Sequence, residues 1–177
     1  MIKKLNLGCG NDIREGWVNL DKIAMKGVDI VCDIERQPLP FNDNEFDEIL
    51  CHDVLEHIDY IPLVRELYRI LKNGGSIFIR APHFSSLNRY LDPTHKNSFS
   101  YRTFDFFVTG HKRSYYFDFS FARVVNQRIT FRKNIFYFYN YIIEPVINLH
   151  PIIRKLYEGT FISRFFPAED IKLTLIK

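Results

Sequence analysis

Short runs rich in apolar residues alternate with polar turns through the first half of the chain. The runs are Lys3–Leu7, Trp17–Leu20, Val28–Cys32, Phe46–Cys51 and Ser76–Ile79. Runs of this length are typical of strands buried on both faces, as in a parallel sheet, although short buried helices would give the same pattern. We therefore predict a strand at each of these runs.

A longer segment with helical spacing lies between the last two runs. Apolar side chains from Ile61 to Leu71 recur every three or four residues, and charged side chains separate them. We predict a helix over residues 60–72, with Pro62 in its first turn and Asn73-Gly74-Gly75 at its end. Because a strand, a helix and a second strand form a right-handed parallel crossover, the first half predicts a doubly wound α/β sheet.

The pattern is less regular after Pro82. We predict an insertion or lid, a long strand, a helical segment that prolines interrupt, and a last strand. These cover His83–Lys112, Phe117–Phe131, Asn134–Tyr157 with breaks at Pro145 and Pro151, and Asp170–Lys177. We expect one domain, with a cofactor-binding half (1–81), an insertion (82–113), and C-terminal strands that carry an inserted aromatic helical segment (114–177).

The composition suits one folded domain in a reducing compartment. Of the 177 residues, 46% are hydrophobic and 16% aromatic, which is enough for one core and unlike a disordered chain. Cys9, Cys32 and Cys51 lie in or beside predicted buried strands, so we interpret them as small core residues rather than disulfide partners. We see no secretion signal and no apolar run long enough to span a membrane, and we expect a cytoplasmic protein.

Charge is distributed unevenly along the chain. The net charge of +3 is too small to indicate a nucleic-acid binder. Residues 1–101 contain 12 basic and 15 acidic side chains, which leaves 24 − 12 = 12 basic and 21 − 15 = 6 acidic for residues 102–177.

The aromatic segment 134–157 favours core packing or a homodimer contact. A wall for a lipid-linked acceptor, or an interfacial membrane contact, is the alternative.

Groups that could bind a ligand follow the predicted strands. They are Gly8-Cys9-Gly10, Asp21, Asp33 and His52-Asp53. In a doubly wound sheet, ligands bind beyond the carboxyl ends of the strands, so these groups should converge. Glycine lets the backbone approach a ligand closely, and strand-end carboxylates can accept hydrogen bonds from a ribose diol and an adenine amino group. Each group alone would be an ordinary turn, but together they indicate a nucleoside-containing cofactor.

A nicotinamide dinucleotide fits this pattern less well. The phosphate-binding turn of such sites has a third glycine where this chain has Ile13. Only eleven positions separate Gly10 from Asp21, too few for a full helix and a strand. The helix N-terminus that would meet a pyrophosphate is therefore absent or stunted. A cofactor without a phosphate, such as S-adenosylmethionine, tolerates that loss.

Four segments in this order resemble a known family. Leu5–Gly10 resembles motif I of the class I S-adenosylmethionine-dependent methyltransferases, and Leu39–Asp47, Val54–His57 and Glu66–Gly75 resemble further segments of the type 11 branch. The resemblance implies a mostly parallel, seven-stranded, Rossmann-like sheet with an antiparallel C-terminal strand. The short spacing after motif I adds the expectation of a truncated first helix.

The resemblance also implies the cofactor contacts. The glycine turn would face the methionine part, Asp21 the ribose, Asp33 and Ile34 the adenine, and His52 or Asp53 the sulfonium. The full predicted set is Asn6, Gly8, Cys9, Gly10, Asp21, Lys22, Asp33, Ile34, His52 and Asp53. Asn6 departs from the motif, which usually has an acidic residue at this position.

Methyl transfer itself requires mainly that the reactants be held in line. An oxygen acceptor also needs a general base, most often a histidine or a carboxylate. The candidates are His57, His83 and His95, with Asp92 and Tyr101 as further possibilities. Each histidine could instead be structural, as a loop or cap residue. His83, His95 and His111 are too irregularly spaced to predict a metal site.

The sequence thus predicts a methyltransferase that acts on an unknown small-molecule, glycan or lipid-linked acceptor, with S-adenosylmethionine as cofactor. Two alternatives remain open. One is a non-catalytic module that binds S-adenosylmethionine and regulates a partner, and the other is an NAD-dependent oxidoreductase. Turnover would distinguish the first alternative, and binding of NAD the second.

Overall fold

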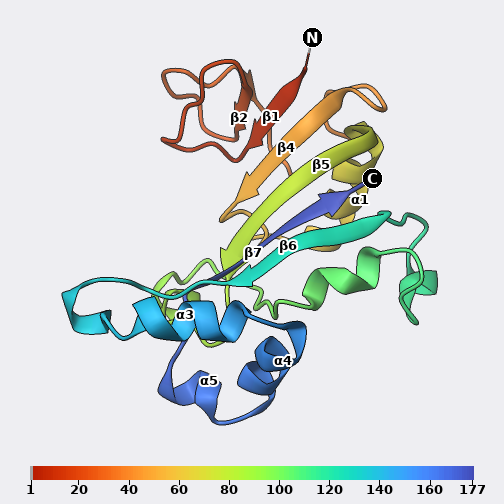
Figure 1. Cartoon of the computed structure of the whole chain (residues 1–177). Helices are drawn as coiled ribbons and strands as arrows, with labels where there is room; N and C mark the ends of the chain where they lie inside the picture. The colour runs from red at the N-terminus through yellow and green to blue at the C-terminus, as the bar shows by residue number, and fades with distance from the viewer. Residues whose placement is uncertain (1) are drawn as a thin grey trace.

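The fold is built on one seven-stranded sheet. The computed structural model describes residues 2–177. The strands are β1 (Lys4–Leu7), β2 (Val18–Asp21), β3 (Ile30–Val31), β4 (Phe46–His52), β5 (Leu71–Pro82), β6 (Arg123–Ile129) and β7 (Asp170–Ile176). Their order is β3-β2-β1-β4-β5-β7-β6, and only β7 runs antiparallel to its neighbours. The predicted mostly parallel sheet with an antiparallel last strand is confirmed (Figure 1).

The strand order reverses beside β1. The chain leaves β1 for β2 and β3 on one side, then returns to place β4 and β5 on the other. Loops that leave the carboxyl ends of β1 and β4 therefore diverge, which opens a crevice of the kind that binds ligands in α/β sheets. The topology places the predicted strand-end groups at this crevice.

Two buried amides replace the missing first helix. Within the described residues, no helix lies between β1 and β2. Asn6 on β1 donates from Nδ2 to the carbonyl of Asp12 at 2.6 Å, and Asn19 on β2 accepts at Oδ1 from the Arg14 N–H at 2.9 Å. The amide of Asn6 also donates to Asn19 Oδ1 at 3.1 Å. These bonds hold the loop after β1 on the sheet.

One long helix connects the central strands. Helix α1 (Tyr60–Ile70) buries Leu63, Val64 and Leu67 among other apolar residues, as its periodicity predicts. It ends two residues before the predicted boundary, because Leu71 already pairs with Phe46 in the sheet. The residues Asn73-Gly74-Gly75 form an irregularity at the start of β5 instead of the predicted helix cap.

The two faces of the sheet differ in their covering. Ile77 and Ile79 on β5 are buried on the side of α1, whereas Phe78 between them keeps 36% of its surface exposed. Figure 1 shows α1 behind the sheet and no helix across the front of β4 and β5. The strands therefore carry their apolar core on one side, and mixed polar and apolar residues face outward on the other.

An aromatic insertion follows β5. It contains α2 (Asn88–Leu91), η1 (Thr103–Phe107) and η2 (Ser114–Tyr116). The rings of Phe119 and Phe121 contact Tyr68 of α1. The predicted strand over 117–131 is therefore wrong in its first part, because these side chains pack against a helix and pairing in β6 begins only at Arg123.

Four short helical segments lie between β6 and β7. They are η3 (Ile135–Tyr137), α3 (Asn140–Asn148), α4 (Pro151–Gly159) and α5 (Ile162–Phe165). The predicted break at Pro145 is wrong, because this proline lies inside α3, whereas Pro151 begins α4. Figure 1 shows α3, α4 and α5 together beyond the end of β5. In the described residues, no helix has the length and apolar character needed to cross a bilayer.

Candidate functional site

A pocket of about 670 Å³ lies at the carboxyl ends of β1, β2 and β4. This volume is within the usual range for sites that bind a cofactor-sized molecule. The predicted residues that line it are Gly8, Gly10, Asp21, Lys22, Asp33, Ile34, Asp53 and His57. The pocket thus brings the predicted cofactor groups together with His57.

Gly8 allows the floor of the pocket to close. Its backbone has a φ of +63°, and a Cβ at this position would lie 2.6 Å from Val54 Cγ2. Real atoms do not approach so closely, and the left-handed backbone also disfavours other residues. The turn after β1 therefore packs directly against the segment after β4, a contact that was not predicted from the sequence.

Asp21 is held in place at the end of β2. Its Oδ2 accepts from the Gly10 N–H at 2.8 Å, and its Oδ1 accepts from the Ile23 N–H at 3.0 Å. A carboxylate has about four acceptor sites, so each oxygen keeps capacity for another donor. An oriented carboxylate with free acceptor sites on a pocket wall is suited to a vicinal diol.

The far wall combines a carboxylate with apolar side chains. Asp33 Oδ1 accepts from the Glu35 N–H at 3.2 Å, and Ile34 packs against the core from the pocket side. Ile23 and Met25 line the same pocket, although they were not predicted. The signal for them was available in the sequence, since they are the apolar residues that follow the β2 carboxylate.

Three predicted cofactor residues do not line the pocket. The amide of Asn6 supports the loop after β1, and the buried Cys9 donates its backbone N–H to the Leu20 carbonyl at 3.0 Å. His52 is half-buried on the open side of the sheet. Burial, followed by the charge of Arg80, lowers its pKa to about 4, so the ring is neutral near pH 7.

Asp53 lines the pocket but already has a partner. It pairs with Arg80 of β5 through two hydrogen bonds, one of them from Arg80 Nε to Oδ1 at 2.9 Å. Asp170 lies close enough that the charge of Asp53, after burial as the main cause, contributes to raising its pKa to about 6. Arg80 thus balances a carboxylate that faces the pocket.

The loop over residues 92–97 forms the opposite rim. The N–H groups of Lys96 and Asn97 donate to the Glu56 carbonyl at 2.7 and 3.1 Å. The Asn97 side chain donates to the Leu55 and Ile58 carbonyls at 2.8 and 2.6 Å. This rim is therefore fastened to the segment that follows β4, as expected for a predicted insertion at the mouth of the site.

A hydrogen-bonded chain fixes the ring of His57. The Thr94 hydroxyl donates to Asp92 Oδ1 at 2.6 Å and lies 2.8 Å from His57 Nδ1. Because the only hydroxyl proton points to Asp92, the Thr94 oxygen accepts from His57 Nδ1–H. This pattern assigns the tautomer that leaves Nε2 free to accept a proton. Thr94 and Asp92 lie in the predicted insertion, but their role in orienting His57 was not predicted.

Glu56, His57 and His95 form a cluster beside the pocket. Each residue has one potential metal-ligating atom within 4.8 Å of those of the other two. The rings of His57 and His95 meet edge to face, with 4.7 Å between their centroids. Glu56 Oε2 and His95 Nδ1 are buried without a hydrogen-bond partner. Burial raises the pKa of Glu56 to about 8 and lowers the pKa of His57, with the charge of His95 as a further cause. Such unpaired buried atoms are costly and are commonly retained for function.

His83 lies apart from this cluster. It is fully buried at the end of β5, where its ring nitrogens bond Ser85 Oγ at 2.8 Å and Glu158 Oε1 at 3.0 Å. Glu158 belongs to α4, so the histidine ties the C-terminal helices to the sheet. It does not line the pocket that contains His57.

Comparison with known proteins agrees with this architecture. Residues 5–79 match the family model described as a methyltransferase domain. An uncharacterized protein of Methanocaldococcus jannaschii is 47% identical over 49 residues, which span 28% of this chain and only 22% of that relative.

Solved methyltransferases share the fold. The structure of an S-adenosylmethionine-dependent methyltransferase from Archaeoglobus fulgidus has a TM-score of 0.65 and 19% identity, covering 99% of this chain and 86% of the other. Coclaurine N-methyltransferase, solved with N-methylheliamine and S-adenosylhomocysteine, has a TM-score of 0.57 and 16% identity, covering 99% of this chain and 65% of that one. The sheet topology and these solved structures together show the fold of the S-adenosylmethionine-dependent methyltransferases, and the family model for a methyltransferase domain matches most of the residues that line the strand-end pocket.

Proposed function

We propose that this protein transfers the methyl group of S-adenosylmethionine to an acceptor that enters under the 92–97 loop, and that His57 accepts the proton which the acceptor loses. The observation that carries the proposal is the shared pocket. The same cavity is lined by the Gly8–Gly10 turn, by Asp21 and Asp33, and by a histidine whose Nε2 is left free to accept a proton.

The pocket walls fit the parts of the cofactor. The narrow turn at Gly8 suits the methionine portion, Asp21 has free acceptor sites for a ribose diol, and Asp33 with Ile34 suits an adenine. When bound, the cofactor supplies an electrophilic methyl group on a sulfonium. The chain's own contribution is to hold the two reactants together and to exclude other orientations, which can provide much of the rate.

His57 is suited to receive a proton near neutral pH. Its lowered pKa keeps the ring neutral, and the bond to Thr94 directs the proton already present to Nδ1. A neutral imidazole with a fixed tautomer accepts a proton at one known atom. In this proposal Thr94 and Asp92 position His57, and they do not contact the acceptor's reacting atom.

Calorimetric titration tests the cofactor assignment. We expect S-adenosylmethionine to bind and NAD not to bind. Asp21→Ala should weaken S-adenosylmethionine binding by roughly 100-fold, because two hydrogen bonds to a charged group are lost. Asp118→Ala, in an exposed ion pair with Arg65, is the matched control and should leave the affinity unchanged. Binding of NAD alone would replace the proposal with an oxidoreductase.

Turnover separates an enzyme from a cofactor-binding regulator. Cell extract fractions incubated with cofactor carrying a labelled methyl group should acquire the label in the presence of the protein. We expect His57→Gln to abolish this transfer while the calorimetric affinity for the cofactor stays within about twofold. Transfer by the variant at the wild-type rate would remove His57 from the mechanism. Activity lost to EDTA and restored by a divalent ion would assign the Glu56–His57–His95 cluster to a metal instead.

A further inference from the structure

The C-terminal helices bury Ile147 and Tyr157 in the core, but they also bury polar side chains and leave many large apolar ones exposed. In α3, Asn140 and Glu144 are buried, whereas Tyr141, Ile142 and Val146 are exposed. A helix on the surface of a water-soluble domain normally turns its apolar stripe inward. The outer side of α3 is therefore unsuited to water.

Helices α4 and α5 likewise bury a polar side chain and expose apolar ones. Arg154 of α4 and Ser163 of α5 are buried. Leu156 of α4 is 56% exposed, and Phe165 of α5 is 72% exposed. Phe161, which precedes α5, is 70% exposed. Three consecutive helices thus present apolar side chains to the outside.

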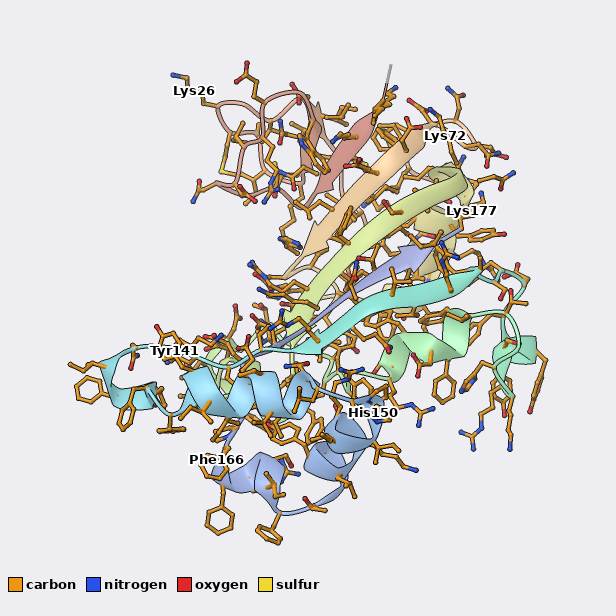
Figure 2. All side chains as sticks on the ribbon, viewed as in Figure 1. Lys26, Lys72, Tyr141, His150, Phe166 and Lys177 are labelled. Carbon is orange, nitrogen blue, oxygen red and sulfur yellow. The ribbon has the colours of Figure 1, made fainter. Side chains whose placement is uncertain are left out.

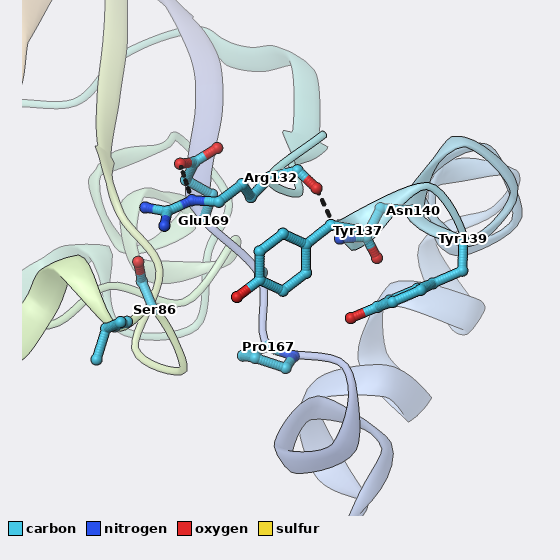
Figure 3. A pocket seen from close by; sticks show the side chains of 9 residues that line it. Ser86, Arg132, Tyr137, Tyr139, Asn140, Pro167 and Glu169 are labelled. Carbon is cyan, nitrogen blue, oxygen red and sulfur yellow. Dashed lines mark hydrogen bonds and ion pairs between the residues drawn. The ribbon is translucent and has the colours of Figure 1, made fainter. Parts of the chain in front are cut away.

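Hydrogen bonds fix this orientation. Glu144 Oε2 accepts from the Phe131 N–H at 3.0 Å, and Asn148 Nδ2 donates to the Ile129 carbonyl at 2.7 Å. Glu158 accepts from the Ser100 hydroxyl at 2.6 Å. Figure 3 shows Asn140 turned inward to the Arg132 backbone, beside a cavity of only about 60 Å³. Rotating the helices to bury their apolar faces would break these bonds and leave buried polar groups unpaired.

The outward apolar side chains are concentrated in residues 135–165, and we call this set the outer helical surface. It consists of Ile135, Phe136, Phe138, Tyr141, Ile142, Val146, Leu149, Ile152, Leu156, Phe161 and Phe165. Figure 2 shows side chains projecting from this end of the molecule, with Tyr141, His150 and Phe166 labelled there. Concentrated exposure of large apolar groups marks an interaction site rather than an ordinary surface.

The charges on these helices are all of one sign where they meet solvent. Lys155 and Arg164 are exposed on the helices, and the exposed Arg132 and Lys133, which precede them, pair with Glu169 and Glu144. The two carboxylates of residues 132–166, Glu144 and Glu158, point inward and are engaged by hydrogen bonds. The outer helical surface is therefore apolar with a cationic border, and this combination complements an anionic lipid bilayer.

A second copy of the chain fits this surface less well. A two-fold contact would bring together two surfaces that both carry exposed cations, with no exposed carboxylate on these helices to neutralise them. We propose that residues 134–166 bind the surface of membranes containing anionic lipids, with the aromatic tips inserted among the head groups. This proposal is independent of the proposed methyl transfer. Membrane binding and cofactor binding are measured in separate assays, so one can fail while the other holds.

Vesicle sedimentation tests the proposal. The full chain should bind vesicles of phosphatidylcholine that contain roughly 30% phosphatidylglycerol. Its partition coefficient for vesicles of pure phosphatidylcholine should be lower by about tenfold or more. Phe161→Ser/Phe165→Ser should weaken binding to the anionic vesicles about tenfold, through lost apolar burial. Lys155→Glu/Arg164→Glu should weaken it by a similar factor and remove the difference between the two vesicle types.

Matched controls keep the result interpretable. Tyr115→Ser/Tyr116→Ser removes two rings that are 74% and 63% exposed elsewhere on the surface, and it should leave vesicle binding unchanged. Every variant should retain the calorimetric affinity for S-adenosylmethionine, which reports that it is folded. Absence of vesicle binding would overturn the proposal. A dimer in light scattering that Phe161→Ser/Phe165→Ser converts to a monomer would also overturn it, and would assign the surface to self-association.

Discussion

Gly8 is the residue at which the pocket's shape is most sensitive to a single atom. Gly8→Ala would place a methyl group 2.6 Å from Val54 Cγ2 on a backbone with positive φ. We expect a loss of about 1–3 kcal/mol of stability and at least tenfold weaker cofactor binding, because the turn must move. Thermal unfolding and calorimetry measure both effects.

Gly110 provides the matched control for that substitution. Its φ is +83°, but a Cβ there would meet no atom within 4 Å. Gly110→Ala should therefore show a backbone cost of about 1 kcal/mol with unchanged cofactor affinity. Equal affinity losses in the two variants would mean that contact with Val54 does not shape the pocket.

Thr94 determines which nitrogen of His57 carries the proton. Thr94→Val keeps the shape of the side chain but removes the hydroxyl oxygen that accepts from His57 Nδ1 at 2.8 Å. We expect the His57 ring to populate both neutral tautomers, which the nitrogen chemical shifts in NMR spectra report directly. Thr94→Ser should restore the Nδ1–H form. An unchanged tautomer in the valine variant would contradict the assignment.

The protonation of Glu56 in the site should make the stability of the fold depend on pH. Its pKa is raised to about 8, mainly by burial, above its ordinary value of 4.5. The folded state therefore holds this proton more tightly than the unfolded state, and stability should fall as the pH rises from about 4.5 to 8. Glu56→Gln should flatten this decline, gaining on the order of 2 kcal/mol relative to wild type at pH 8.5 but little at pH 4. Chemical unfolding at the two pH values measures the difference, and parallel pH profiles would contradict it.

At the scale of elements, the amide pair of β1 and β2 replaces a helix. Asn19 bonds the loop after β1 through the Arg14 N–H and carbonyl, and it also bonds Asp29. Asn19→Ala should cost about 2–3 kcal/mol and expose the 9–17 loop to protease, because several buried groups lose their partners. Asn73→Ala, at an exposed position, should change neither property. Resistance of the Asn19 variant to protease would assign the order of the loop to other contacts.

Elements whose apolar pattern is regular were predictable from the sequence, including the last strand β7, whereas the packing of the aromatic insertion was not. The apolar runs indicated β1, β2 and β4, and helical spacing indicated α1. The alternation through Phe117, Phe119 and Phe121 arises from packing against α1, so a pattern typical of a strand occurs outside the sheet. The alternation of apolar residues alone does not distinguish a strand in the sheet from an irregular segment packed against a helix.

In the candidate site, too, some residues could be predicted from the sequence and others could not. Asp21 and Asp33 were predictable because strand order alone brings strand ends together. The partnership of His57 with Thr94 was not, because it joins residues 37 positions apart through a loop without periodic structure. Asn6 was misjudged since its motif position suggested a ligand contact, whereas the short first loop uses its amide as a support.

At the scale of the whole molecule, a helix covers only one face of the central strands. Neighbouring residues of a strand should therefore contribute very differently to the free energy of unfolding. Ile77 is fully buried under α1, whereas Phe78 is 36% exposed on the open face. We expect Ile77→Ala to cost about 3 kcal/mol and Phe78→Ala less than about 1 kcal/mol. Denaturant unfolding measures both. Similar costs would indicate that something covers the open face in solution.

The position of β7 in the sheet has a consequence for how the protein is made. β7 lies between β5 and β6, so β6 has no strand partner until residues 170–176 are available. During synthesis β7 therefore emerges after β6, the aromatic insertion and the apolar helices. In that interval the nascent chain exposes the edges of β5 and β6, which are sites for pairing with other chains. Aggregation of the nascent chain should therefore decrease when β7 pairs with β5 and β6, and not already when β1 to β4 have formed.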